Sequence, residues 1–148
     1  MGMRGCVGII RFSSEIVSAQ IKMQSNGSKI WVLPYAVIQP IPFKFELADY
    51  YIFTSRHAVR QVLSRVRIKQ ARPVLISGQA TAGLVRKYWP EAQVILGRQQ
   101  GISDIKDFVR DMPGLGRWYR GVDVVDQEAF DGYFVVGVPV YQLISLPK

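Results

Sequence analysis

Short apolar segments alternate with amphipathic stretches along most of this 148-residue chain. Apolar runs of about four to eight residues bounded by turn residues are typical of buried strands, whereas apolar residues spaced at i, i+3 and i+4 are typical of helices packed on one face. Strands separated by helices of about ten to fifteen residues are joined by right-handed crossovers and therefore lie parallel. The pattern predicts an α/β fold, with helices on both faces of a parallel sheet.

Turn residues and apolar spacing place the individual elements. Strands are expected at Gly5–Ile10, Lys29–Leu33, Tyr50–Phe53, Pro73–Ile76, Val94–Leu96, Arg117–Arg120 and Tyr133–Val138. Helices are expected after the caps Ser13 or Ser14, Ser55 and Ser103, and after a turn at Gly78. Because three prolines lie between Pro34 and Pro42, we expect the second strand to stop at Pro34 and an extended linker to follow. A second extension is expected to begin at Pro139.

Positive charge is concentrated in one part of the chain. The net charge is +8, yet residues 50–90 contain no acidic residue, whereas residues 91–131 contain eight acidic and five basic residues. The basic residues of the first stretch are Arg56, Arg60, Arg65, Arg67, Lys69, Arg72, Arg86 and Lys87. A field of one sign attracts ligands of the opposite sign, so this distribution favours an anionic partner. Each of these charges taken singly also fits an ordinary solvated surface.

The sequence lacks the motifs of the common cofactor, metal and hydrolase sites. It contains no phosphate-binding glycine loop, and its single histidine and single cysteine cannot form a zinc cluster, so no metal site is expected. No apolar stretch is long enough to span a membrane, and the amino terminus lacks the apolar core of a signal peptide. Cys6, in a strand-like run, is interpreted as a buried hydrophobe, so a cytoplasmic location without membrane contact is expected.

Polar and glycine residues follow several of the expected strands. The turns are Phe53-Thr54-Ser55, Ser77-Gly78-Gln79-Ala80-Thr81 and Tyr119-Arg120-Gly121. The carboxyl ends of parallel strands meet at one edge of a sheet, where ligands bind, and helix amino termini there can hold carboxylates or phosphates. The same hydroxyls also fit simple helix capping, and Gly78 also fits a tight turn with positive φ.

A series of short motifs follows one another in a set order along the chain. The motifs are Arg11-Phe12, Leu33-Pro34, Phe53-Thr54-Ser55 with Ala58-Val59, Gly78-Gln79-Ala80-Thr81-Ala82, Arg120-Gly121 and Val140-Tyr141. Their order and spacing resemble those of the uroporphyrinogen-III synthase family, and the resemblance runs from about Val7 to Pro147. Each motif is only moderately specific by itself, so the resemblance rests on their order.

The resemblance implies a protein of two α/β lobes with the active site between them. Residues 1–39 would open lobe one with a βαβ unit, 40–42 would link the lobes, 43–138 would form a complete three-layer lobe two, and 139–148 would return to lobe one. The family closes hydroxymethylbilane, a linear tetrapyrrole with acetate and propionate groups, into uroporphyrinogen III with ring D inverted. A hydroxyl leaves to give an azafulvene, and a spiro intermediate follows, without metal or cofactor.

The resemblance also assigns roles to residues of this chain. Tyr141 takes the place of the tyrosine that assists loss of the hydroxyl, and a phenol stays protonated at neutral pH and can donate a hydrogen bond. A hinge tyrosine that packs between lobes is the alternative for this position. The expected substrate-binding residues are Thr54, Ser55, Gly78, Thr81, Arg120, Gly121 and Arg11. His57 falls where relatives carry arginine, and we interpret it as structural.

The chain departs from the family pattern by ending seven residues after Tyr141. From this we expect an incomplete lobe one, self-association that completes it, and weak turnover by the chain alone. One alternative is a remnant that binds tetrapyrroles without enzymatic activity. The other is a basic RNA-binding α/β domain that uses the run Arg65–Arg72, although no known RNA-binding signature accompanies that run.

Overall fold

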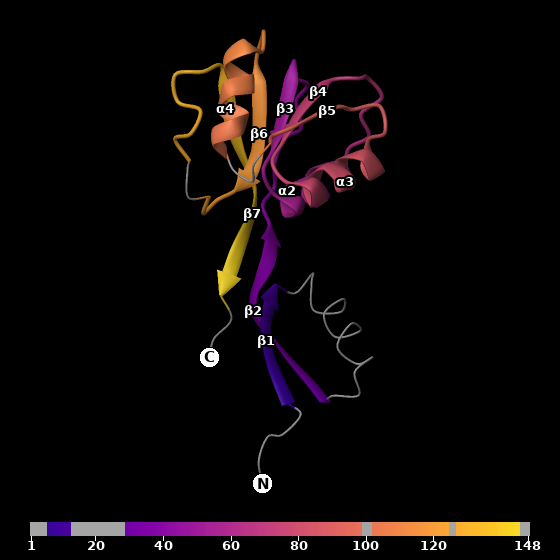
Figure 1. The fold of residues 1–148 in the computed structure, drawn as a ribbon, viewed down its shortest axis with the longest axis vertical. Coiled ribbons are helices and arrows are strands. Elements are labelled where there is room, and N and C mark those ends of the chain that lie inside the picture. Colours follow the sequence, from indigo (N-terminus) through magenta and orange to yellow (C-terminus); the bar gives the residue numbers. More distant parts are fainter. Residues whose placement is uncertain (1–5, 13–28, 99–101, 125–126, 146–148) are drawn as a thin grey trace. The chain divides into compact units, whose positions relative to one another are not determined.

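The computed structural model of the chain describes residues 6–12, 29–98, 102–124 and 127–145. The chain divides into two compact units, one made of Met1–Gln39 with Leu143–Lys148 and the other made of Pro40–Gln142. In the first unit, β1 (Cys6–Phe12) pairs in parallel with β2 (Lys29–Pro40), as Figure 1 shows. The helix expected between Ser13 and Gly27 lies outside the described residues.

The second unit is built on a parallel sheet. Its strands are β3 (Tyr50–Phe53), β4 (Pro73–Ile76), β5 (Gln93–Leu96), β6 (Gly116–Gly121) and β7 (Val135–Ser145). They lie in the order β7-β6-β3-β4-β5, and every neighbouring pair is parallel. The predicted α/β class with a parallel sheet is therefore confirmed for this unit.

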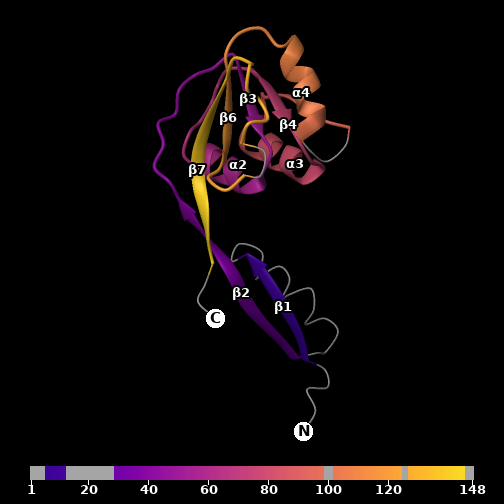
Figure 2. The same ribbon diagram turned by 90° about the vertical axis from the view of Figure 1, so that its left-hand side faces the viewer.

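Helices cover both faces of this sheet (Figures 1 and 2). The helices are α2 (Arg56–Leu63), α3 (Gln79–Tyr88) and α4 (Ile102–Asp111). Alternate residues of a strand point to opposite faces, so Tyr51 and Phe53 of β3 join the core under α2 and α3, whereas Tyr50 and Ile52 join the core under α4. Among the described residues, no helix is long and apolar enough to cross a membrane.

Local signals in the sequence account for two helix starts. Ser55 accepts a hydrogen bond from the backbone nitrogen of His57 at 3.1 Å and so caps α2 as predicted. Gly78 precedes α3 with φ +92°, the left-handed conformation that its turn was expected to need. The prediction for α4 is wrong in detail, because the helix already includes Ile102 and Ser103 therefore lies inside its first turn.

Pro34 and Pro139 lie inside strands, so the strand ends predicted at Pro34 and before Pro139 are wrong. β2 continues through Pro34 to Pro40, and β7 continues through Pro139 to Ser145. In both cases the register then skips one residue: Arg11 pairs with Pro34 but Phe12 with Ala36, and the same shift follows Pro139. A proline lacks the N–H needed for a regular ladder, so it is tolerated in a strand where a bulge interrupts that ladder.

Aromatic rings fill the core between the sheet and the α2–α3 layer. Tyr119 of β6 is fully buried, and rings of Phe43, Phe45, Tyr51 and Phe53 lie 5.8–6.2 Å from it, centroid to centroid. Burial disfavours the ionised phenol and raises the pKa of Tyr119 to about 12. The stability of this core therefore depends on Tyr119 remaining protonated.

We expect alkaline pH to destabilise the chain through Tyr119. An unfolded tyrosine ionises near pH 10, whereas the folded pKa is about 12, so the stabilisation is complete below about pH 10 and is lost as pH rises towards 12. Two pKa units correspond to about 3 kcal/mol in the free energy of unfolding. Tyr119→Phe should remove that part of the pH dependence, measured by urea unfolding at several pH values.

The matched control is Tyr88→Phe, which removes a phenol at the surface of α3, where the residue is 37% exposed. The free energy of unfolding of the control should fall above pH 10 as it does in the wild type. If it falls equally steeply in Tyr119→Phe, burial of Tyr119 is not the cause of the loss of stability at alkaline pH.

Candidate functional site

The parallel pairing brings the predicted turns to one edge of the sheet of the second unit. Thr54 and Ser55 follow the end of β3, Gly78 follows β4, and Arg120 and Gly121 end β6. From β3 the chain goes to β4 on one side, whereas from β6 it goes to β7 on the other side. Ligands of open α/β sheets bind where the strand order reverses in this way, so the ends of β3 and β6 define the candidate site.

Tyr141 meets the first of these turns directly. Its hydroxyl donates a hydrogen bond to Ser55 Oγ at 3.0 Å, across 86 positions of sequence. The His57 ring packs against the Tyr141 ring with centroids 5.7 Å apart and planes at 67°. These contacts lie within the second unit, because Tyr141 belongs to Pro40–Gln142. The predicted catalytic tyrosine and one predicted binding residue are thus in contact.

The bulge after Pro139 directs Tyr141 to this position. Pro139 pairs with Arg120, and Tyr141 pairs with Gly121, so Val140 is the extra residue. As a result Val140 and Tyr141 both pack on the core under α2 and α3, whereas strict alternation would place them on opposite faces. The Ile41 backbone nitrogen donates to the Val140 carbonyl at 3.0 Å and supports the bulge.

Glycine at position 121 leaves the space that the Tyr141 ring occupies. A Cβ atom on Gly121 would come within 2.8 Å of the Tyr141 ring and 3.0 Å of its hydroxyl oxygen. Gly121 therefore has a steric role besides its predicted role in binding, because any side chain here would displace Tyr141.

Thr54 is held by an aromatic donor from β6. Trp118 Nε1 donates to Thr54 Oγ1 at 3.1 Å. The indole is buried, the Phe130 ring lies edge-on to it with centroids 4.9 Å apart, and the Arg120 guanidinium lies 5.4 Å from its ring centre. Arg120 also donates to the carbonyl of Gly121 at 3.0 Å. Arg120 therefore contacts Trp118 and supports the turn at the end of β6.

A hollow of about 570 Å³ opens at the start of α3. It is lined by Thr54, Arg56, Ser77, Gly78, Gln79, Ala80 and Thr81. Thr81 is only 5% exposed, so its hydroxyl lies at the inner wall of the hollow. The free N–H groups and positive dipole end of α3, together with Arg56, make this hollow suitable for an anion.

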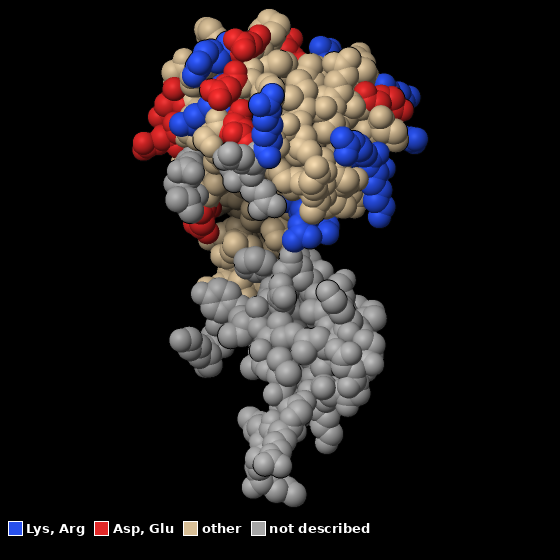
Figure 3. Space-filling view, viewed as in Figure 1, with Lys and Arg blue, Asp and Glu red and all other residues tan. Residues whose placement is uncertain are grey.

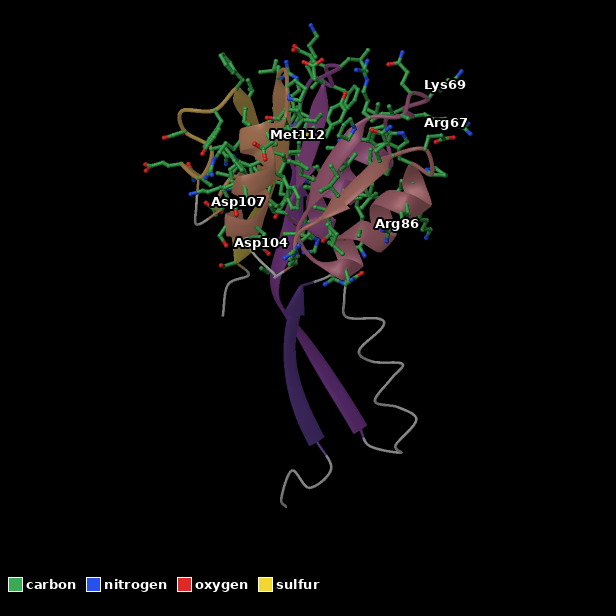
Figure 4. All side chains as sticks on the ribbon, turned by 45° about the horizontal axis from the view of Figure 1, so that its top comes forward. Arg67, Lys69, Arg86, Asp104, Asp107 and Met112 are labelled. Atoms are coloured by element: carbon green, nitrogen blue, oxygen red, sulfur yellow. The ribbon has the colours of Figure 1, made fainter. Side chains whose placement is uncertain are left out.

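Charge is distributed unevenly over the second unit. Figure 3 shows Lys and Arg over the α2–α3 side, and most of the Asp and Glu on the α4 side, where basic residues are interspersed. Figure 4 shows Arg67, Lys69 and Arg86 projecting from the first side, and Asp104 and Asp107 on α4. Asp107 pairs with Arg110 at 3.5 Å. The hollow at α3 therefore adjoins the basic side of the unit.

Seven of the eight predicted site residues belong to the second unit, and one belongs to the first. Thr54, Ser55, Gly78, Thr81, Arg120, Gly121 and Tyr141 lie at the carboxyl edge of one sheet. Arg11 lies in β1 of the other unit, opposite Pro34, and is not brought to this edge within the second unit.

One contributor was missed by the sequence reasoning. Trp118 lies one position inside the predicted strand Arg117–Arg120, and its hydrogen bond to Thr54 follows only from the order of strands. His57, interpreted as structural, packs its ring against Tyr141, and this contact is compatible with that interpretation. The Phe53-Thr54-Ser55 motif marked the right turn, but nothing in the sequence indicated which side chains would face it.

No protein-family model matches this sequence, and a search of curated proteins finds no match. Among the described residues, no three or more His, Cys, Asp or Glu side chains lie together where they could hold a metal ion. This edge offers the amino terminus of α3, the Arg56 guanidinium and the hydroxyls of Thr54, Ser55, Thr81 and Tyr141.

We expect Gly121→Ala to separate Tyr141 from Ser55 with only a modest loss of stability. The added methyl would overlap the Tyr141 ring, which must move because pairing with β7 holds the Gly121 backbone opposite Tyr141. Overpacking of this kind costs about 1–3 kcal/mol. Ultraviolet resonance Raman spectra should show the loss of one phenol that donates to an oxygen.

Gly83→Ala in α3 is the matched control, because a Cβ there would meet no atom within 4 Å. It should raise stability by up to about 1 kcal/mol, since alanine favours a helix over glycine. Unchanged tyrosine spectra in Gly121→Ala would show that Tyr141 is not held against Gly121.

Proposed function

We propose that this chain is a uroporphyrinogen-III synthase-like protein that binds hydroxymethylbilane and promotes its closure to uroporphyrinogen III. In the overall reaction the hydroxyl of the linear tetrapyrrole leaves as water, and a carbon–carbon bond closes the macrocycle with ring D inverted. The proposal rests on the motif order in the sequence and on the chemistry of the edge formed by β3, β4 and β6.

The single observation that carries the proposal is the hydrogen bond from Tyr141 to Ser55. The resemblance names these two residues from motifs 86 positions apart, one as the group that assists hydroxyl loss and one as a substrate ligand. Their contact at the switch point of the sheet puts a proton donor beside a binding residue, as general acid assistance requires.

The hollow at α3 supplies the second requirement, a place for carboxylates. Backbone N–H groups after Gly78, the Thr81 hydroxyl and the Arg56 guanidinium are all hydrogen-bond donors. No acidic residue lines this hollow, so nothing there repels an acetate or propionate group. A linear tetrapyrrole with several carboxylates would place one of them here while another part of the molecule reaches Tyr141.

Binding without turnover is the second form of the proposal, and it uses the same residues. The RNA alternative uses a different surface, the basic residues between Arg65 and Arg72 and at the end of α3. The three outcomes are distinguished by which ligand protects the chain from thermal unfolding, by the salt dependence of that protection, and by whether uroporphyrinogen III is formed.

We expect Arg56→Gln to weaken protection by uroporphyrinogen III about three- to tenfold. The substitution removes a positive charge from the lining of the hollow, and a charge-assisted hydrogen bond is worth about 1.5–3 kcal/mol, less where water screens it. Thr81→Val should have an effect of about the same size, because it removes a buried hydroxyl while keeping the volume. Thermal-shift titration gives the apparent affinities.

The matched control is Arg86→Gln, which removes the same charge from the last turn of α3, away from the hollow. Its effect should stay below about twofold and vanish as salt rises. Equal weakening by Arg56→Gln and Arg86→Gln would mean that the basic surface attracts anions without a specific site. Protection by RNA that is lost with Arg86→Gln would favour the RNA alternative.

A further inference from the structure

The Ser55 hydroxyl receives two hydrogen bonds from its surroundings. The backbone nitrogen of His57 donates to Ser55 Oγ at 3.1 Å, and the Tyr141 hydroxyl donates to the same oxygen at 3.0 Å. A serine hydroxyl has two acceptor positions and one hydrogen. Both acceptor positions of Ser55 are therefore occupied, and only its hydrogen remains for another group.

The direction of the Tyr141–Ser55 hydrogen bond follows from the acidity of the two groups. A phenol is a stronger donor and a weaker acceptor than an aliphatic hydroxyl, because its oxygen lone pairs are delocalised into the ring. The His57 N–H is a donor only, so it fixes one lone pair of Ser55 in every arrangement. Ser55 accepts in both contacts, so its own hydrogen is engaged in neither of them.

We infer that Ser55, and not Tyr141, presents the hydrogen that contacts the ligand, and that Tyr141 is a positioning residue that acts through Ser55. This inference deepens the proposed function and, in its reference to the leaving hydroxyl, rests on it. In the reaction Ser55 O–H donates to the departing oxygen as the C–O bond breaks. The proton then passes to that oxygen, which leaves as water, and the Tyr141 proton replaces it on Ser55. The N–H proton that the pyrrole ring releases as the azafulvene forms balances this transfer and returns Tyr141 to its neutral phenol.

Thr54 shows the same arrangement beside Ser55. Its Oγ1 accepts from Trp118 Nε1, a group that can only donate, at 3.1 Å. Phe130 and Arg120 hold the indole from two sides, so the direction of this N–H is fixed. The consecutive hydroxyls after β3 thus both accept hydrogen bonds from aromatic side chains, one from β6 and one from β7, which favours ligands that accept hydrogen bonds.

The arrangement selects the chemistry of the ligand. A free hydroxyl can donate or accept, whereas Ser55 with both lone pairs engaged can only donate. A carboxylate or a leaving hydroxyl, which accepts, is favoured over a ligand that offers an N–H at this point. Electrostatic stabilisation by donors that are already oriented needs little reorganisation when charge develops on the departing oxygen.

A double-mutant cycle between positions 55 and 141 tests the inference. With hydroxymethylbilane as substrate, Tyr141→Phe should lower kcat about threefold and Ser55→Ala about tenfold, in line with hydrogen bonds of about 0.5–1.5 kcal/mol. The double variant should be no worse than Ser55→Ala alone, because Tyr141 has nothing to act through without Ser55. Multiplied losses, about thirtyfold, would mean that Tyr141 contacts the ligand itself and would overturn the inference.

Ser55→Thr is the conservative control, since it keeps a hydroxyl and a helix cap and should recover most of the activity. A second readout needs no ligand and no activity. Ultraviolet resonance Raman difference spectra against Tyr141→Phe should show Tyr141 as a donor in the wild type and in Ser55→Thr, and not in Ser55→Ala. A Tyr141 spectrum typical of a phenol that accepts would overturn the inference even in an active protein.

The two readouts keep this inference separate from the proposed function. If the wild type neither binds nor converts tetrapyrroles, the proposed function fails, while the Raman spectra still decide which hydroxyl donates. Because Ser55→Ala removes a cap worth about 1 kcal/mol, its folding is checked by thermal unfolding. If Ser55→Ala does not fold, Ser55→Asp takes its place, because an ionised aspartate caps the helix and accepts hydrogen bonds but cannot donate one.

Discussion

β7 carries one more residue than β6 between the pairings of Pro139 and Tyr141, and the candidate site depends on that extra residue. If the same residues ran without the bulge, Val140 would pair with Gly121, and alternation would turn Tyr141 towards the α4 side of the sheet, away from Ser55. With it, Tyr141 packs on the α2–α3 side beside Gly121 and reaches the cap of α2. A proline in a strand and a glycine on its neighbour together position one phenol.

Ser55, the cap of α2, is the residue that the repositioned Tyr141 contacts. Ser55 starts the helix by accepting a backbone N–H, and the same oxygen accepts from Tyr141. One oxygen therefore serves both the helix cap and the contact with Tyr141, and our proposal assigns its remaining hydrogen to the ligand. Next to it, Thr54 and the amino terminus of α3 add further donors, and no carboxylate lines the hollow between them. The edge as a whole is suited to an anionic ligand.

The repeated strand–helix pattern was enough to predict the parallel sheet and the turns at its carboxyl edge, because both follow from periodicity and from local cap and turn residues such as Ser55 and Gly78. The prolines were misinterpreted, since Pro34 and Pro139 were taken as strand ends and instead precede bulges. Trp118 and His57 could not be assigned to the site from the sequence. Their contacts depend on which strands become neighbours, and local patterns do not encode that order.

The central claim is that an anionic tetrapyrrole binds at the carboxyl edge formed by β3, β4 and β6. Nuclear magnetic resonance of the ¹⁵N-labelled chain, titrated anaerobically with uroporphyrinogen III, tests it most directly. We predict that amide shifts change with saturation at Thr54–His57, at Gly78–Thr81 and around Gly121. Changes confined to Arg65–Arg72 and to Arg86 and Lys87, or no saturable change at all, would contradict the account.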